Sequence, residues 1–247
     1  AMPRITLIAG TYQPDRCGVA HYTRHLREML SQRGIESIVL TTHEAAQAAN
    51  DPTVQGVIDR WHIRHLMPLV QAIHTTKADL LHIQHAAGTY GFDRSIFLLP
   101  FLLRMTRWHQ PIVTTIHEYG WWEWQPEYIP AQALEWLKIW GQKQGWWDRE
   151  DGFLLTQSDA LITTNYDAEQ VIATRLPHLK QKIRRIPIAA NVESNLSNQV
   201  QAKRTLCQRY GWSEDSLIAV FFGFLHPVKG IEGLMDAFQK VLTTHPA

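Results

Sequence analysis

The sequence contains only two cysteines, no long apolar run and almost no net charge. Cys17 and Cys207 form neither a CxxC pair nor a metal-binding spacing, so no disulfide framework is expected and a reducing, cytoplasmic compartment is favoured. Polar residues, Pro and Gly interrupt the apolar segments before the ~18 residues that a membrane span requires, and we expect a soluble chain without a secretory leader. With 24 Lys+Arg against 23 Asp+Glu, the chain lacks the basic stripe of a nucleic-acid binder. The expected partners are small molecules or polar polymers, not nucleic acid.

The pattern of apolar residues predicts an α/β fold. The 247 residues, 45% of them hydrophobic, are enough for one or two domains with a core. Short β-branched runs alternate with stretches of helical periodicity, which is typical of a Rossmann-like, doubly wound parallel sheet. Strands are expected at Arg4–Ala9, Ser37–Thr41, Leu80–Gln84, Ile112–Ile116, Ala160–Thr164, Ile183–Ile188 and Leu217–Gly223.

A polar segment divides the chain. Residues 191–201 are rich in Asn, Ser and Gln and lie between a predicted strand and a predicted helix, which indicates a linker. We therefore expect an N-terminal domain over residues 2–190 and the start of a C-terminal domain over residues 202–247. One strand and two helices cannot close a sheet with a core of its own. A missing C-terminal half or a partner chain is expected to complete this part.

A turn containing glycine follows the first predicted strand, between Gly10 and Ala20. A glycine at a helix N-terminus, here Gly18, lets backbone N–H groups approach an anion that the helix dipole also favours. The alternative is that Gly18 serves only the tight turn. The absence of a GxGxxG fingerprint argues against a nicotinamide-dependent oxidoreductase. From its surroundings in the sequence alone, Cys17 is expected to pack, because nothing positions a base near it.

Histidines end two of the predicted strands. Ligands of doubly wound sheets bind outside the carboxyl ends of the strands, so His85 and His117 are candidates for binding. The alternative is that each satisfies a loop carbonyl. No metal site is expected, because His82 and His85 point to opposite faces of their strand and no helical HExxH partner follows His117.

A lysine and a cluster of tryptophans complete the candidates. Lys229 precedes the last predicted helix, where the dipole disfavours a cation, and an anionic ligand would explain it; the alternative is a solvated surface lysine. Eight of the ten tryptophans lie between positions 108 and 147. The i, i+4 spacing of Trp136 and Trp140 favours a small aromatic core. Trp121, Trp122 and Trp124 cannot all face one core, so at least one is expected to be exposed, for a sugar ring or a membrane interface.

Together these motifs resemble those of the GT-B glycosyltransferases of family 4. Residues 14–22 resemble the family's N-terminal glycine-rich loop, with Cys17 where many members have a glycine. His82–His85 and Thr115–Glu118 resemble its second and third loop motifs. Residues 223–238 resemble the opening of its nucleotide-binding domain, and this is the most specific of the motifs.

The resemblance implies a GT-B fold and a metal-independent, retaining hexosyltransferase without a cofactor. Its substrate would be a nucleotide diphosphate sugar, UDP-sugar favoured, and its acceptor a hydroxyl of a saccharide or a lipid-linked saccharide, in polysaccharide or lipid-linked glycan synthesis. It also allows a cytoplasmic protein that contacts the inner face of the membrane peripherally.

By the same resemblance, His117 and Lys229 are the catalytic residues. The other residues expected to bind substrate are Cys17, Gly18, Val19, His85, Glu118, Tyr119, Trp121, Trp122, Asn165 and Gly223. Phe224 stands where many members carry an arginine, so the usual pair of cations is incomplete. A non-catalytic saccharide- or nucleotide-binding protein on the same framework is therefore the alternative.

Overall fold

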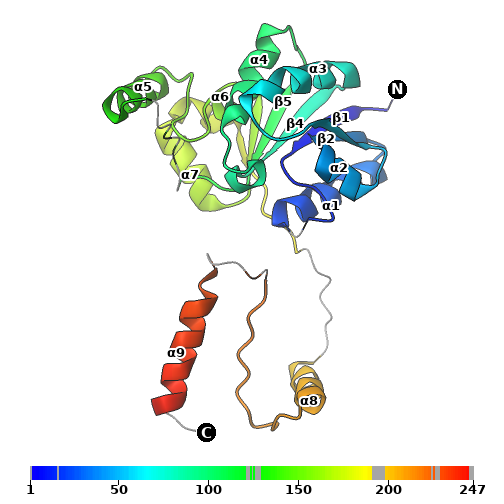
Figure 1. Cartoon of the computed structure of the whole chain (residues 1–247), viewed down its shortest axis with the longest axis vertical. Helices are drawn as coiled ribbons and strands as arrows, with labels where there is room; N and C mark the ends of the chain where they lie inside the picture. Colours follow the sequence, from blue (N-terminus) through cyan, green and yellow to red (C-terminus); the bar gives the residue numbers. More distant parts are fainter. Residues whose placement is uncertain are drawn as a thin grey trace. The chain divides into compact units, whose positions relative to one another are not determined.

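The computed structural model describes residues 2–15, 17–120, 123, 125, 129–190, 198–223, 225 and 229–244. The chain divides into two compact units, Ala1–Asn191 and Val192–Ala247. The first unit is a parallel sheet of seven strands with helices on both faces (Figure 1). The predicted α/β fold with a doubly wound parallel sheet is confirmed.

Six of the seven strands lie where the sequence predicts them. They are β1 (Arg4–Ala9), β2 (Glu36–Thr42), β4 (Leu80–His85), β5 (Ile112–Ile116), β6 (Ala160–Thr163) and β7 (Ile183–Arg185). The seventh, β3 (Val54–Ile58), was not predicted; it is a short edge strand with a glycine at its centre. Gly56 is needed there, because a Cβ would lie 2.6 Å from His43 Cα.

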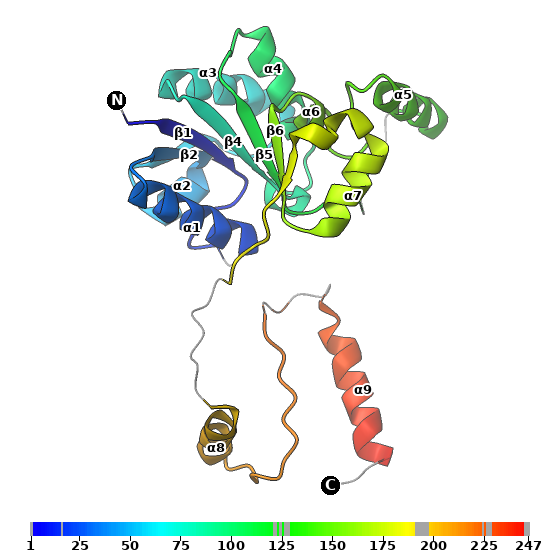
Figure 2. The same ribbon diagram turned by 180° about the vertical axis from the view of Figure 1, so that it is seen from behind.

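Two helical layers enclose the sheet (Figures 1 and 2). The helices of the first unit are α1 (Gly18–Gln32), α2 (His43–Ala49), α3 (Leu66–Thr76), α4 (Leu99–Met105), α5 (Ala131–Lys143), α6 (Phe153–Thr156) and α7 (Tyr166–Arg175). The larger core lies under α3 and α4, and a smaller one lies under α1 and α2. Alternate residues of β1 serve both cores, because Ile8 faces the first and Leu7 the second.

The second unit contains α8 (Gln199–Tyr210) and α9 (Ile231–Thr244). Residues 217–223 form no strand, so that prediction is wrong. A parallel strand requires neighbours on the sheet, and all strands in the described part of the chain lie in the first unit. The apolar face predicted for α9 is present in sequence, but none of the side chains of this helix is buried. Among the described residues, no helix has the length and apolarity to cross a membrane.

Candidate functional site

The candidate site lies at the carboxyl ends of β1, β4 and β5, where the order of the strands reverses. The sheet order is β3-β2-β1-β4-β5-β6-β7, so the chain builds outward from β1 on one side and then resumes with β4 on the other. The loops after β1 and β4 therefore diverge. Open α/β sheets bind their ligands in the crevice that such loops leave.

Gly10 lets the two diverging loops touch. It follows β1, and a Cβ at this position would lie 2.4 Å from the carbonyl oxygen of Thr89 in the loop after β4. Trp61 Nε1 donates to the Gly10 carbonyl at 3.2 Å. The floor of the crevice is thus a backbone-to-backbone contact that no larger residue allows.

We expect Gly10→Ala to lower the free energy of unfolding by about 1–3 kcal/mol, because the methyl group must displace backbone instead of a flexible side chain. Gly18→Ala is the matched control, since a Cβ at Gly18 meets no atom within 4 Å. Urea unfolding of the two variants measures the difference. Equal midpoints would show that the loops separate without cost.

The turn after β1 leaves the start of α1 open. α1 begins at Gly18, with Cys17 as its N-cap residue, and no described side chain caps this end. The first N–H groups of a helix have no partner within the helix, and the dipole favours an anion beside them. The Cys17 thiol is half-buried and free. The end of α1 can therefore accept an anionic ligand through its backbone.

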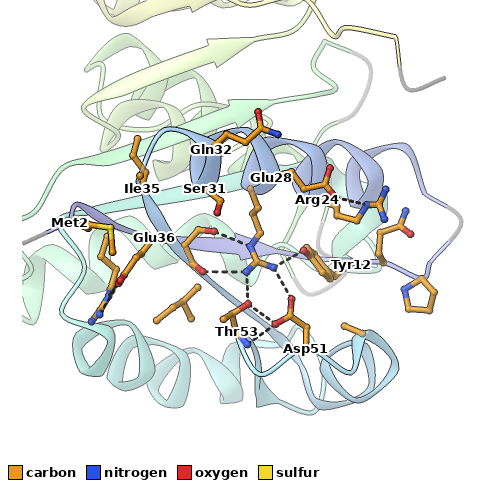
Figure 3. Close-up of a pocket in the computed structure, with 18 of the residues that line it drawn as sticks. Met2, Tyr12, Arg24, Glu28, Ser31, Gln32, Ile35, Glu36, Asp51 and Thr53 are labelled. Atoms are coloured by element: carbon orange, nitrogen blue, oxygen red, sulfur yellow. Dashed lines mark hydrogen bonds and ion pairs between the residues drawn. The ribbon is translucent and has the colours of Figure 1, made fainter. Parts of the chain in front are cut away.

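A set of hydrogen bonds braces this turn. The Arg27 guanidinium donates to the Tyr12 hydroxyl at 2.6 Å and also to Ser37, Asp51 and Thr53; Figure 3 shows Tyr12, Asp51 and Thr53 converging on one guanidinium. These residues line a groove of about 1120 Å³ along α1. Because its central cation makes five such bonds, the groove holds Tyr12 in place and thereby fixes the turn.

Buried polar side chains connect β4 to His117. Gln84 Nε2 donates to His82 Nε2 at 3.2 Å, and Gln84 Oε1 accepts from His117 Nε2 at 2.9 Å. His82 Nε2 also lies 2.8 Å from Thr115 Oγ1. Tyr22 of α1 meets the His117 ring edge to face, with centroids 4.8 Å apart. Because an amide oxygen only accepts, His117 carries its proton on Nε2 and presents Nδ1 as an acceptor.

Both histidines of this chain of hydrogen bonds are neutral at pH 7. Burial lowers the pKa of His82 to about 4. Burial, and then the nearby His85 and His82 rings, lowers the pKa of His117 to about 4 as well. A neutral His117 is suited to a hydrogen bond with a hydroxyl group and not to pairing with a charge.

These pKa values predict a loss of stability in acid. Between pH 6.5 and 4 the unfolded chain takes up protons at His82 and His117 that the folded chain does not, so the free energy of unfolding falls as the pH is lowered. We expect the fall to be shallower in His82→Gln, by at most about 3 kcal/mol. Urea titrations at pH 7, 5.5 and 4.5 measure both slopes. The same slope in parent and variant would contradict a protonation-linked cost at His82.

His85 faces the other side of β4, as the sequence predicts. Its Nε2 lies 2.9 Å from Asp151 Oδ1, and its ring packs beside Tyr90 and Phe97. Its carbonyl accepts from the His117 N–H at 2.9 Å. His85 is buried and holds the backbone from which His117 projects.

A turn of acidic residues anchors the loop after β5. Tyr119 donates its hydroxyl proton to Asp148 Oδ1 at 2.6 Å, and the Gly120 N–H donates to Glu150 Oε2 at 2.8 Å. Burial, and then Asp151, raises the pKa of Asp148 to about 7. Although three acids lie within four positions, no group of His, Cys, Asp and Glu side chains among the described residues could hold a metal ion. The turn therefore holds the loop that carries His117.

A cavity of about 540 Å³ opens beside the crevice. Its walls come from the loops after β2, β3 and β4, which all end at the same edge of the sheet. They are Gly10, Thr42, Glu44, Asp59, Arg60, Trp61, His62, Tyr90, Gly91 and Asp93. The cavity combines carboxylates, an arginine and an indole, which is a lining suited to a ligand rich in hydroxyl groups.

The structure brings part of the predicted site together. Cys17, Gly18, His85 and His117 lie at one edge of the sheet, because α1 packs on His117 through Tyr22. The side chain of Val19 is partly buried and that of Glu118 is exposed. The hydroxyl of Tyr119 is occupied by Asp148, as described above. Roles in binding substrate stay predictions for all of them.

The remaining predicted residues lie elsewhere. Asn165 caps α7, where its side chain accepts from the Ala168 N–H at 2.8 Å. Gly223 and Lys229 are exposed residues of the second unit. Trp121 and Trp122 lie outside the described residues, as do Trp124 and Phe224.

Sequence reasoning missed three residues that organise this edge. Gln84 lies inside the quoted His82–His85 motif, and its alternation with His82 on one face of the strand was the available signal. Asp151 belongs to a conspicuous run of charged residues, 148–151, but nothing local indicates that it lies against His85. Trp61 is isolated in the sequence and gave no signal.

Comparison with known proteins identifies the family of this arrangement. The family model described as Glycosyltransferase Family 4 matches residues 17–194, well over half of the chain. Comparison with curated protein sequences gave no match.

Two solved structures illustrate the likeness in fold. The catalytic domain of starch synthase IV from Arabidopsis thaliana, bound to ADP and acarbose, has a TM-score of 0.56 at 10% identity, over 98% of this chain and 66% of that one. An alpha-glucosyltransferase in complex with UDP-glucose and DNA containing an abasic site has a TM-score of 0.42 at 11% identity, over 74% of this chain and 42% of that one. The chain therefore spans between about two fifths and two thirds of the length of these structures.

Proposed function

This chain belongs to glycosyltransferase family 4, with a fold of the GT-B type, and we propose that it serves the transfer of a sugar from a nucleotide diphosphate sugar to an acceptor hydroxyl. The donor proposed is a UDP-sugar, the acceptor a saccharide or a lipid-linked saccharide, and the anomeric configuration is retained. The reaction as proposed uses no metal and no cofactor.

One observation carries the proposal. The uncapped N-terminus of α1 and the neutral His117 meet at the point where the strand order reverses. The first favours a negatively charged oxygen, and the second offers Nδ1 to a hydroxyl proton. A sugar joined to a phosphate presents both groups within one molecule.

The proposed chemistry follows from these positions. The bond between the anomeric carbon and the phosphate oxygen breaks, and the electron pair leaves with the diphosphate. The acceptor oxygen forms the new bond to the anomeric carbon, and its proton passes to the departing phosphate. The α1 N–H groups and Lys229 would stabilise the charge that develops on that phosphate. His117 would orient a hydroxyl of the donor sugar through Nδ1, since its Nε2 is held by Gln84.

The cavity beside Gly10 is the place proposed for the acceptor. Asp59 and Glu44 can accept hydrogen bonds from sugar hydroxyls, and the Trp61 ring offers an apolar face to a pyranose. Gly10 forms a wall both of this cavity and of the crevice. An acceptor bound there would therefore approach the same end of the sheet as the donor.

Turnover assays on the full-length protein test the proposal. UDP-, GDP- and ADP-sugars are first ranked by the shift in melting temperature that they cause, and the best donor is then assayed for release of its nucleotide diphosphate with and without acceptor. We expect a UDP-sugar to rank first and release to require acceptor. Donor binding without any release across a panel of saccharide and lipid-linked acceptors would support the non-catalytic binding protein instead.

A further inference from the structure

Helix α5 has its charged residue inside and its largest apolar residues outside. Its buried positions are Leu134, Lys138 and Gly141. The Lys138 side chain is only 3% exposed and pairs with Glu123 at 3.3 Å, whereas Trp136 is 61% and Trp140 43% exposed. Lysine is among the residues least often buried, and an exposed pair of tryptophans is equally unusual. The sequence predicts a small aromatic core for these two tryptophans, and that prediction is wrong.

The outward face of α5 is continuous with other exposed rings. The rings of Trp136 and Trp140 stack at 5.9 Å with 3° between their planes, and Trp140 meets Trp146 at 5.4 Å. Trp146 stacks on Phe153 at 6.0 Å, and Phe153 stacks on Phe101 of α4 at 5.0 Å. A band of aromatic side chains thus runs from α5 to α4.

Aliphatic side chains extend this band. Ile139 is exposed on α5, one position before Trp140, and Met105 is exposed at the end of α4. We call Trp136, Ile139, Trp140, Trp146, Phe101 and Met105 the aromatic surface. α5 lies at the outer edge of the first unit in both views (Figures 1 and 2). The surface is therefore an exposed apolar patch at the periphery of this unit.

The inner side of α5 is fixed firmly enough to hold this surface in place. A Cβ at Gly141 would lie 3.0 Å from Trp147 Cβ, so the helix approaches its support closely. Arg149 bonds both Glu123 and Glu135, which joins α5 to the loop before it and to the acidic turn after it. The tryptophans are presented outward by a rigid helix.

The charges around the surface are cationic. Lys143 is exposed on the same face of α5, three positions after Trp140, and Arg107 is exposed two positions after Met105. Acids near the surface are engaged within the protein: Glu135 pairs with Arg149, and Asp159 pairs with Arg104. The rim therefore favours a negatively charged partner.

From this combination we propose that the aromatic surface docks the protein on a lipid bilayer that contains anionic headgroups. Tryptophan prefers the boundary between headgroups and acyl chains, aliphatic side chains enter the acyl region, and lysine and arginine pair with anionic lipid. A second copy of the chain would bring like charges together. A saccharide would find Trp136 and Trp140 partly covering each other and no hydrogen-bonding group on Ile139 or Met105. The proposal concerns where the protein resides and does not depend on the proposed function.

Vesicle flotation with the purified full-length protein tests this proposal. Vesicles of phosphatidylcholine alone are compared with vesicles that also contain phosphatidylglycerol. We expect binding to the anionic vesicles, weakened by salt. The double variant Trp136→Ser/Trp140→Ser should lose at least about tenfold in affinity, and Lys143→Glu about fivefold or more. Both substitutions are at exposed positions, so circular dichroism and melting temperature should match the parent.

Matched controls separate the aromatic surface from the rest of the protein. Trp212→Ser removes an exposed tryptophan of the second unit, and Phe238→Ser interrupts the exposed apolar face of α9; neither should change vesicle binding. Equal binding by the parent and the double tryptophan variant would overturn the proposal, as would loss of binding in Phe238→Ser alone. A parent that ignores anionic vesicles but is dimeric in solution, with a monomeric double variant, would assign the surface to self-association instead.

Discussion

His117→Ala is expected to lower kcat by about 100-fold while changing the melting temperature little. A contact that orients the donor sugar at the reacting centre contributes mostly in the transition state, and removing one such pre-organised group costs about 100-fold or more. The stability cost is small, because His117 lies at the carboxyl end of β5 and loses only its hydrogen bond to Gln84 and its contact with Tyr22. Steady-state kinetics and thermal unfolding on the full-length protein measure the two effects separately.

The control for this prediction is His109→Ala, an exposed histidine before β5, which should leave kcat unchanged. Gln84→Glu tests how His117 is positioned: a carboxylate at position 84 would favour the imidazolium and raise the pKa of His117 from about 4. Activity of this variant should then rise with pH where that of the parent is flat. If His117→Ala turns over like the parent, His117 binds no substrate and its contacts serve the fold alone.

The sheet could be predicted from sequence because its strands are distinctive locally. β1 and β5 are short, β-branched runs with polar residues at their ends, and their predicted bounds are confirmed. β3 could not be recognised, since Val54–Ile58 contains Gln and Gly and its place in the sheet depends on pairing with β2. Residues 217–223 show the reverse case: an apolar run satisfies the local pattern but becomes a strand only where another strand lies beside it.

The candidate site could be predicted only where one segment carries it. His85 and His117 were found because strand ends are visible in the sequence and parallel strands end at the same edge. The partners that fix them were not, because Asp151 lies 66 residues from His85 and Gln84 lies 33 from His117. Which side chain reaches which across the sheet depends on the packing of whole elements, and no spacing in the sequence encodes it.

Helix α5 failed for a different reason. The i, i+4 spacing of its tryptophans is equally compatible with a face turned inward or outward, and apolar composition alone decided for the core. The choice is made by Lys138, whose partner Glu123 lies in a preceding loop. Burying that pair turns the opposite face, with Trp136 and Trp140, toward the surroundings.

Lys229→Ala is expected to weaken donor binding and to slow transfer, each by tenfold or more. Lys229 is exposed just before α9, at an end where the dipole disfavours a cation, so a bound diphosphate would give it a purpose. A charge-assisted contact with phosphate is worth ~1.5–3 kcal/mol, and more where charge builds up as the leaving group departs. Since ~1.4 kcal/mol corresponds to one decade, affinity and rate should each fall by at least that factor.

Two further variants give this expectation its sharpness. Lys240→Ala removes another lysine of the second unit, in α9 itself, and should change neither quantity. Lys229→Arg should restore only part of the loss, because a planar guanidinium and a compact ammonium present their donors differently. Phe224 supplies no second cation, so dependence on Lys229 should be heavier than where an arginine shares the charge. Unchanged donor affinity and turnover in Lys229→Ala would leave it a solvated surface lysine, and the donor phosphate would then depend on the α1 N-terminus alone.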